Sequence, residues 1–431
     1  MNNLRQFDVL VVGGGPAGLA AATRAAERGK RIGLVDDNPS LGGQIWRIAR
    51  EAPAPQATEW INQFRAAGGE VLPSSRVYQQ SEPGVLLAET PERELKLSYN
   101  KLVLATGARE RFLPFPGWTL PNVIGAGGLQ ALVKTGLPIE GKRVVVAGSG
   151  PLLVAVAVYL RKHGANVLFV CEQASLASLA TFGIALLRQL GKIKEGLSFR
   201  RQLSGAPYYP NSWPVRAEGR QQLESVTISR NGKLETFDCD YLACGFHLVP
   251  NTELPTLLGC RLEGNCVQVD ELQETSMKGI YCAGEPTGIG GLELALVEGE
   301  IAGLAAAGRE AEARKHFPLR GKLRSFAQAM DHAFAPRSEL KNLPQAEDII
   351  CRCEDVTFVR ASQYSSWRAA KLQTRCGMGP CQGRICGPIA EFLFNWRPGS
   401  VRPPIFPARI SSMSASPDRQ SASSQTSVGG D

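Results

Sequence analysis

Five cysteines crowded between positions 351 and 386 are the residues of this 431-residue chain best suited to chemistry. Cys351 and Cys353 form one close pair, and Cys381 and Cys386 form a second. Four thiolates from two close pairs are the ligand count of a [2Fe–2S] cluster. Basic side chains between the pairs would partly offset the charge of such a cluster. We therefore predict a [2Fe–2S] cluster on these four cysteines, with Cys376 as a bystander or an alternative ligand.

Two alternatives to an iron–sulfur cluster remain open for these cysteines. Zinc modules more often use Cys-x₂₋₄-Cys pairs on both sides of the site, and the first pair here has one intervening residue. The thiols could also be plain buried side chains without a metal. Six of the eleven cysteines lie outside this crowd, and no Cys-x-x-Cys pair is present, so thiol–disulfide chemistry is not expected.

A glycine-rich turn near the start of the chain has the spacing of a dinucleotide-binding site. It lies between an apolar run typical of a strand and an alanine-rich run typical of a helix, and reads Gly13-Gly14-Gly15-Pro16-Ala17-Gly18. The first glycine permits a tight turn, the second lets the backbone approach a pyrophosphate, and the third lets helix and strand pack closely. An acidic residue ends the next strand, where it can accept ribose hydroxyls. The predicted dinucleotide site comprises Gly13, Gly15, Pro16, Ala17, Gly18 and Asp36.

The same pattern returns as Gly148-Ser149-Gly150-Pro151-Leu152-Leu153, with one departure. Leu153 stands where a third glycine or an alanine is expected, and its branched side chain would crowd the helix or the phosphate. Glu172 follows the next strand and favours NAD over NADP, but Cys171 occupies the nearer position. We interpret this second turn as a retained scaffold with an idle or altered nucleotide site, and working NAD binding stays an alternative.

Composition supports a folded chain of several domains. Hydrophobic residues make up 43% of the sequence and charged residues 20%, which excludes global disorder. The two strand–turn–helix–strand units predict two dinucleotide-type α/β domains, the second inserted into the first, followed by a small helical cysteine-rich module. The expected boundaries are 1–116 and 249–312 for the two parts of the first domain, 117–248 for the inserted domain, 313–345 for a linker, 346–396 for the cysteine-rich module and 397–431 for a tail that is disordered from about 411.

Charge and hydropathy exclude several other functions. The net charge of +8 is mild for this length and no run of five or six basic residues occurs, so nucleic acid is not an expected partner. No apolar run approaches the ~18–20 residues that span a bilayer. The first strand begins too early for a signal peptide. We expect a cytoplasmic protein, with a peripheral position at the inner membrane only through a partner.

Two further strand ends carry a resemblance. The runs Leu104-Ala105-Thr106-Gly107-Ala108 and Ile280-Tyr281-Cys282-Ala283-Gly284-Glu285 resemble the FAD-binding halves of flavoproteins with two dinucleotide domains, although Glu285 stands where that superfamily usually has aspartate. The resemblance implies FAD at the first turn, with Glu285 holding its ribityl or pyrophosphate part. The segment Gly42-Gly43-Gln44 resembles the one beside the flavin ring. The cofactor-binding residues that this resemblance adds are Gly43, Gln44, Ala105, Thr106, Gly107, Gly284 and Glu285.

The cysteine-rich module is similar to the bacterioferritin-associated-ferredoxin-like [2Fe–2S] domain, and residues 375–387 resemble the version fused to certain FAD subunits. Together these motifs cover about residues 5–395. They resemble the α (A) subunits of heteromeric opine oxidases and D-hydroxyproline dehydrogenases, and the B subunit of hydrogen cyanide synthase. The resemblance implies a flavin-containing β subunit that carries the substrate site, a small third subunit in some assemblies, FMN at a subunit interface in some complexes, and a quinone or other electron acceptor.

Three functions are compatible with these features. The first is electron transfer through FAD and [2Fe–2S] in an oxidoreductase whose partner subunit oxidises a secondary amine, an opine or an amino or imino acid. The second is a self-contained NAD(P)H-dependent flavin reductase. The third is a non-catalytic nucleotide-binding scaffold subunit. The sequence assigns no catalytic residue, and His247 is only a weak candidate for a base.

Overall fold

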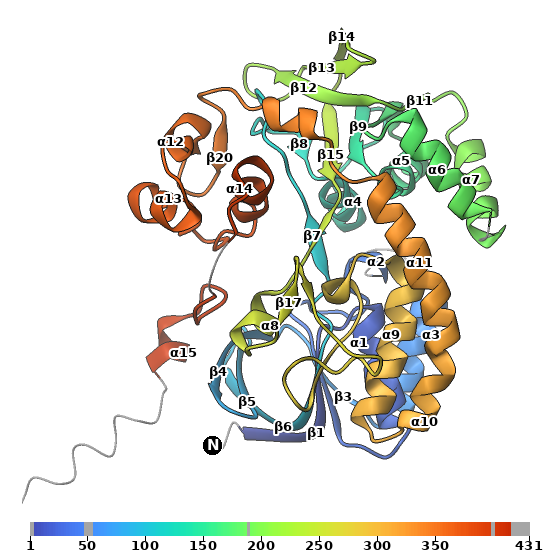
Figure 1. Cartoon of the computed structure of the whole chain (residues 1–431), viewed down its shortest axis with the longest axis vertical. Coiled ribbons are helices and arrows are strands. Elements are labelled where there is room, and N and C mark those ends of the chain that lie inside the picture. The colour runs from blue at the N-terminus through green and yellow to red at the C-terminus, as the bar shows by residue number, and fades with distance from the viewer. Residues whose placement is uncertain (1–3, 47–54, 188–189, 398–400, 415–431) are drawn as a thin grey trace, which may run out of the picture.

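The computed structural model describes residues 4–46, 55–187, 190–397 and 401–414. Two α/β domains are stacked along the long axis of the molecule, and the cysteine-rich module lies beside them (Figure 1). Within the described residues, no helix is both long enough and apolar enough to cross a membrane.

The first domain is built on a seven-stranded sheet with the order β3-β2-β1-β6-β5-β4, in which β19 pairs with β6. The pairs β1–β2, β1–β6, β2–β3 and β6–β19 are parallel, as in a dinucleotide-binding sheet. Its strands are β1 (Leu4–Val12), β2 (Ile32–Val35), β3 (Glu70–Leu72), β4 (Arg76–Glu82), β5 (Val85–Glu89), β6 (Glu94–Leu104) and β19 (Ile280–Cys282). Because β19 follows the inserted domain in sequence, the sheet is completed only after the chain returns.

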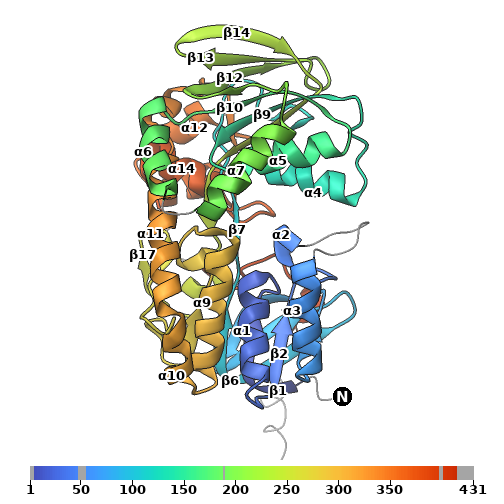
Figure 2. The same ribbon diagram turned by 90° about the vertical axis from the view of Figure 1, so that its right-hand side faces the viewer.

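Helices α1 (Pro16–Ala26), α3 (Pro55–Ala66) and α9 (Gly291–Ala306) lie together on one side of this sheet (Figure 2). The contact between α1 and α9 is close because glycines face alanines. A Cβ atom on Gly299 would lie 2.2 Å from the carbonyl oxygen of Ala17, and one on Gly303 would lie 2.2 Å from that of Ala21. The first glycine turn and the helix that follows β19 are thereby held in fixed register.

The inserted domain repeats the parallel pattern on a five-stranded sheet with the order β11-β10-β9-β15-β8. Its strands are β8 (Val123–Ile124), β9 (Arg143–Ser149), β10 (Asn166–Glu172), β11 (Tyr208–Tyr209) and β15 (Tyr241–Phe246). Its helices are α4 (Ala126–Thr135), α5 (Leu152–Lys162), α6 (Leu176–Leu186) and α7 (Leu190–Gln202). A three-stranded antiparallel sheet of β12 (Ser212–Glu218), β13 (Ser225–Arg230) and β14 (Lys233–Asp238) covers one side.

A two-stranded ribbon joins the two domains. It pairs β7 (Ala108–Glu110) with β16 (Leu248–Pro250) in antiparallel fashion, one strand on the way out and one on the return. The returning chain then forms the short elements α8 (Glu253–Leu257), β17 (Leu262–Glu263), β18 (Cys266–Val267) and η1 (Glu285–Thr287). In the first domain, the short helix α2 (Gly43–Trp46) contacts α1.

After α9, the chain forms α10 (Glu310–Ala313), η2 (Arg314–His316) and α11 (Phe317–Ala333). Helix α11 packs along α9 and then against α6, so it spans both domains (Figure 1). The cysteine-rich module contains η3 (Ser338–Asn342) at its approach, β20 (Ile349–Cys351), β21 (Val356–Thr357), α12 (Phe358–Ser362), α13 (Trp367–Thr374) and α14 (Cys386–Phe394). The predicted small helical module thus also holds a two-stranded ribbon.

The tail differs from the prediction of disorder from about residue 411. Residues Ile410–Ser414 form α15, and positions 415–431 lie outside the described residues. Before α15, the backbone amide of Ile405 donates to the carbonyl of Tyr78 at 2.9 Å, and within α15 the Ser412 hydroxyl donates to Glu89 at 3.1 Å. These contacts with β4 and β5 hold a segment whose composition alone is typical of a loop.

Candidate functional site

The first glycine turn needs each of its glycines for a different steric reason. A Cβ atom on Gly13 would lie 2.1 Å from the carbonyl oxygen of Ala105, and one on Gly18 would lie 1.7 Å from that of Gly13. These two positions therefore admit no side chain. At Gly15, by contrast, the only neighbour among the described residues within 4 Å of an added Cβ is the Cα of Gly43, at 3.8 Å. The space in front of Gly15, at the N-terminus of α1, is thus open to a ligand.

Asp36 holds this turn together from the end of β2. Its side chain is buried and accepts hydrogen bonds from the backbone amides of Gly14, at 2.6 Å, and Asn38, at 2.7 Å. One carboxylate thereby orders both the glycine turn and the start of the loop after β2. Its predicted contact with a ribose adds to this structural role and stays a prediction.

Thr106 and Gly107, at the end of β6, are fixed by a residue that the sequence did not single out. The Thr106 hydroxyl donates to the carbonyl of Asn251 at 2.6 Å, and the Asn251 side chain donates to the Thr106 carbonyl at 2.9 Å. The Asn251 amide also donates to the Gly107 carbonyl at 2.9 Å. Asn251 follows the returning strand β16, so only the tertiary fold brings it here.

Glu285 lies at the N-terminus of α9. Its carboxylate accepts hydrogen bonds from the amides of Gly290, at 3.2 Å, and Gly291, at 3.0 Å. Burial raises the pKa of Glu285 to about 7, although these amide bonds act in the opposite direction. The ribityl or pyrophosphate contact expected of Glu285 stays a prediction, and the structure gives this residue amide partners within the chain.

Gly284 is positioned by two residues that sequence reasoning missed. The buried carboxylate of Glu298 accepts the Gly284 amide at 3.1 Å and also pairs with Arg324 of α11 at 2.7 Å. A buried glutamate in the middle of a helix was a possible signal, because an acid is rarely buried without a partner. Helix α11 is thereby tied to the strand end that bears the predicted flavin residues.

These features fit a bound FAD. The turn is open at Gly15, the N-terminus of α1 favours phosphate charge, and an acid lies at the end of β2. Gly43 approaches the same turn, since a Cβ on Gly43 would lie 3.0 Å from the Cα of Gly15. Gln44 follows in α2 and is exposed. The structure therefore gathers the N-terminal predicted residues around one space.

The second glycine turn packs tightly against the strands and the helix of its own domain. A Cβ atom on Gly148 would lie 1.8 Å from the carbonyl of Gly245, and Leu153 is buried in the core between β9 and α5. Glu172 is fully buried and accepts the amides of Gly150 and Ala174, each at 2.8 Å. Burial raises the pKa of Glu172 to about 7. This carboxylate orders its turn in the same way as Asp36 orders the first turn.

Residues at the second turn are also hydrogen-bonded to the chain's own linker. The Ser149 hydroxyl donates to the carbonyl of Phe334 at 2.6 Å. The Gln173 side chain donates to the carbonyl of Ala335 at 3.1 Å and accepts the amide of Arg337 at 3.1 Å. Residues 334–337, here called the crossing segment, thus lie over the carboxyl ends of β9 and β10. Ligands of such sheets bind at that edge.

Three of the five clustered cysteines meet in the interior of their module. The sulfur atoms of Cys351, Cys376 and Cys386 all lie within 4.8 Å of one another, and all three residues are buried. Hydrogen bonds from the other two thiols lower the pKa of Cys351 to about 2. The bond to Cys351 raises the pKa of Cys376 to about 12 and is also the main cause that raises the pKa of Cys386. In this arrangement two thiols stabilise one thiolate. A metal cation could bind all three sulfur atoms and displace the two thiol protons.

The other two cysteines form a second, more exposed pair. Cys353 is exposed and Cys381 is partly buried, and the two side chains interact. The structure therefore brings all four predicted ligands into one module and adds Cys376 to the buried group. Glycines 377 and 383 lie against each other and against Trp367, which leaves backbone close to the sulfurs. This all-thiol donor set fits an iron–sulfur cluster or zinc.

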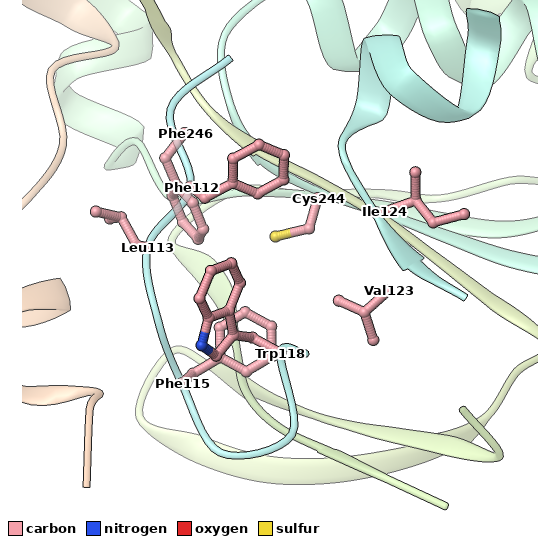
Figure 3. A pocket seen from close by; sticks show the side chains of 8 residues that line it. All are labelled: Phe112, Leu113, Phe115, Trp118, Val123, Ile124, Cys244 and Phe246. Carbon is pink, nitrogen blue, oxygen red and sulfur yellow. The ribbon is translucent and has the colours of Figure 1, made fainter. Parts of the chain in front are cut away.

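Two cavities differ in whether they could admit a substrate. The one shown in Figure 3 is lined by aromatic and aliphatic side chains around Cys244 and encloses about 10 Å³, which is room for about one water. A larger hollow of about 1050 Å³ lies between the two domains. Its lining includes Pro151, Leu152, Arg200, Gly290, Gly291 and Phe326. It faces the N-terminus of α9 and has room for a ligand or for part of another subunit.

Comparisons with known proteins agree with this geometry. Residues 7–311 match the family model described as pyridine nucleotide-disulphide oxidoreductase. The chain is 31% identical to the HcnB subunit of hydrogen cyanide synthase from Pseudomonas protegens, over 88% of this chain and 89% of that protein. It is 30% identical to the A subunit of opine oxidase from Rhizobium meliloti, over 96% of this chain and 89% of that protein.

A solved structure with a similar fold is L-proline dehydrogenase from P. horikoshii. The TM-score is 0.70 at 20% identity, covering 95% of this chain and 80% of that one. Thioredoxin reductase of T. acidophilum gives a TM-score of 0.54 at 19% identity, covering 71% of this chain and 99% of that one. At these identities the similarity establishes the fold alone.

Proposed function

This chain belongs to the pyridine nucleotide-disulphide oxidoreductase family, and we propose that it is the FAD- and [2Fe–2S]-containing electron-transfer subunit of a heteromeric dehydrogenase or oxidase. The substrate class that we propose is a secondary amine, an opine or an amino or imino acid. Substrate oxidation takes place on a partner protein that contains its own flavin, and a quinone or another acceptor receives the electrons.

One observation carries this proposal. The chain combines a nucleotide turn that is open at Gly15 with a compact all-cysteine group, and the residues beside its second nucleotide turn, Ser149 and Gln173, are hydrogen-bonded to its own crossing segment. Bound flavin accepts two electrons at once and a [2Fe–2S] cluster passes them on singly. The chain's own residues supply the binding sites: the first glycine turn for FAD, and Cys351, Cys353, Cys381 and Cys386 for the cluster.

The relatives support the heteromeric part of the proposal. Those with about 30% identity over most of the chain are named as subunits, one of opine oxidase and one of hydrogen cyanide synthase. We propose no catalytic base and no carboxylate-binding site among the described side chains, which is consistent with a substrate site on the partner. A partner with its own flavin, a small third subunit and FMN at the interface belong to the proposal, and the hollow of about 1050 Å³ offers room for such an interface.

Cofactor analysis tests the redox part. The purified chain should contain FAD, together with iron and acid-labile sulfide at about two each per chain. Cys353→Ser and Cys381→Ser should lose the cluster, whereas Cys376→Ser should retain it. Stoichiometric zinc without iron in anaerobically prepared protein would contradict the proposed cluster. Loss of iron in Cys376→Ser would mean that the buried Cys376, and not one of the more exposed cysteines, is a ligand.

Co-expression tests the heteromeric part. The isolated chain should show no dye-linked dehydrogenase activity towards opines, hydroxyproline-like imino acids or glycine. Activity should appear on co-expression with a partner subunit that contains its own flavin. Robust turnover by the isolated chain would move the substrate site into this subunit.

A further inference from the structure

We infer that Arg109 is a positioning residue that holds the cysteine loop, residues 376–387, against the end of β6 and thereby sets the path of electron transfer between the two redox sites. This inference rests on the proposed function for its redox consequence. Its structural basis is independent of any bound group. Arg109 lies in β7, the strand of the ribbon that joins the two domains.

Arg109 makes three polar contacts that point to two different parts of the molecule. Its Nε atom donates to the carbonyl of Arg384 at 3.0 Å. Its Nη1 atom donates to Oδ1 of Asn251 at 2.7 Å and lies 2.9 Å from a carboxylate oxygen of Glu253. About a fifth of the Arg109 and Glu253 side chains is exposed (21% and 22%), so water only partly competes for these bonds.

One side of this contact leads directly to the predicted flavin residues. Asn251 donates to the Thr106 carbonyl at 2.9 Å and accepts the Thr106 hydroxyl on its own carbonyl at 2.6 Å. Thr106 stands in the Ala-Thr-Gly turn at the end of β6. Any shift of Asn251 therefore moves the backbone of that turn.

The other side leads to the cysteines. Arg384 lies between Cys381 and Cys386, and its own amide donates to the Cys381 carbonyl at 3.1 Å. The Arg384 guanidinium donates to the carbonyl of Ile405 at 2.8 Å, with its central carbon 3.9 Å from the centre of the Phe406 ring, and its Nε lies 4.0 Å from the Glu253 oxygen that Arg109 also contacts. Arg109 therefore binds the backbone of the cysteine loop, and the tail holds the same loop from the other side.

Three hydrogen bonds in series thus connect Thr106 to Arg384 through Asn251 and Arg109. In this path one electron leaves the reduced flavin and one enters the cluster, with no bond made or broken. A planar guanidinium is suited to the junction because it donates in several directions from a rigid fork, which a lysine ammonium does not reproduce. A shift at such a junction changes the distance between the two redox sites, and the rate of electron transfer falls as that distance grows.

Hydrogen–deuterium exchange of the full-length chain tests the structural half. Arg109→Gln should accelerate exchange in peptides covering 104–110 and 376–387, and Arg109→Lys should do the same because it cannot bond both partners. The matched control is Arg143→Gln, which removes an arginine paired with Asp240 at 2.9 Å in the inserted domain, far from the cysteines in sequence. The control should leave both peptides at wild-type rates.

Rapid-mixing reduction, with the cluster followed by EPR, tests the redox half. At wild-type FAD and iron content, Arg109→Gln and Arg109→Lys should slow the appearance of reduced cluster by at least about tenfold, and Arg143→Gln should not. Hydrogen exchange at wild-type rates in the Arg109 variants would overturn the inference. Faster hydrogen exchange together with an unchanged rate of cluster reduction would also overturn it. Wild-type protein without FAD or iron would instead contradict the proposed function, and the exchange result would still decide the role of Arg109.

Discussion

The two glycine turns of this chain share one pattern and differ in what faces them. At the first turn, a Cβ atom added to Gly15 would meet only the Cα of Gly43 among the residues that the structure describes, and the N-terminus of α1 points into this space. At the second turn, the hydroxyl of Ser149 is bonded to the crossing segment and Glu172 is buried beneath it. A strand, a glycine turn and a helix therefore predict a fold reliably, and whether a nucleotide can bind depends on what the rest of the chain places there.

The largest effect that would separate the two turns is loss of FAD. Gly15→Val should abolish retention of FAD through gel filtration, because its side chain would project into the space for the pyrophosphate while the backbone at this position is extended and unstrained. The absorbance ratio of flavin to protein measures this.

The matched change at the second turn is Gly150→Ala. It should retain FAD and lose about 1–3 kcal/mol of stability, because Gly150 has a φ of +101°. Equal flavin content in Gly15→Val and the wild type would show that FAD does not bind at the first turn.

The second prediction concerns Leu153, the residue that breaks the pattern. Leu153→Ala should cost about 2–5 kcal/mol of stability because the side chain is 1% exposed in a packed core. It should not create NADH binding, because the crossing segment still covers the turn. Chemical unfolding and fluorescence titration with NADH measure the two effects.

Leu152→Ala is the control for this prediction, since its side chain is 36% exposed and its loss should change stability much less. Tight NADH binding by Leu153→Ala would mean that the leucine alone closes the site.

The contrast between the turns also shows what the sequence could predict. Both strand–turn–helix units, the inserted domain and the strand β19 that completes the first sheet follow from local hydrophobic patterns and glycine spacing. The crossing segment does not, because Ser149 and Phe334 are 185 positions apart and neither residue has a local pattern that indicates the contact. Asn251, Glu298 and Arg324 were missed for the same reason.

The sequence predicted which cysteines belong to the module, but it did not predict how they are arranged in space. Spacing predicted four ligands, and that set stays a prediction. Only the fold shows that Cys376 lies with Cys351 and Cys386, because its neighbours in space come from β20 and the start of α14. Similarly, Arg109 directly follows the run from Leu104 to Ala108, and its bond to Arg384 spans 275 positions. Long-range polar contacts of this kind leave no periodic signal.

The third prediction tests whether the crossing segment excludes NADH. NADH should reduce the flavin of the wild-type chain much more slowly than the ~10 s⁻¹ of a typical turnover. Gln173→Ala removes three hydrogen bonds to this segment, each worth roughly 1 kcal/mol, so it should strengthen NADH binding by at most about a hundredfold. Stopped-flow absorbance and titration measure these values.

Gln222→Ala, which replaces an exposed glutamine of the same domain, is the control and should behave as the wild type. Flavin reduction near ~10 s⁻¹ by NADH in the wild type would reverse the contrast between the turns and favour the self-contained reductase.

The smallest expected effect is a pH dependence that Glu172 gives to the second turn. Burial raises the pKa of Glu172 from 4.5 to about 7, so the folded chain favours the protonated acid. The stabilisation from this proton is complete below pH 4.5 and is lost as the pH rises through about 7.

Glu172→Gln stays neutral, so its free energy of unfolding relative to the wild type should rise by about 1–3 kcal/mol between about pH 5 and pH 8. Chemical unfolding across this pH range measures the effect, with Glu235→Gln, an exposed acid 3.5 Å from Arg230, as the control. A difference that stays constant across this range would mean that Glu172 remains ionised beneath the turn, and its buried charge would then have to be balanced by the two amides of Gly150 and Ala174 alone.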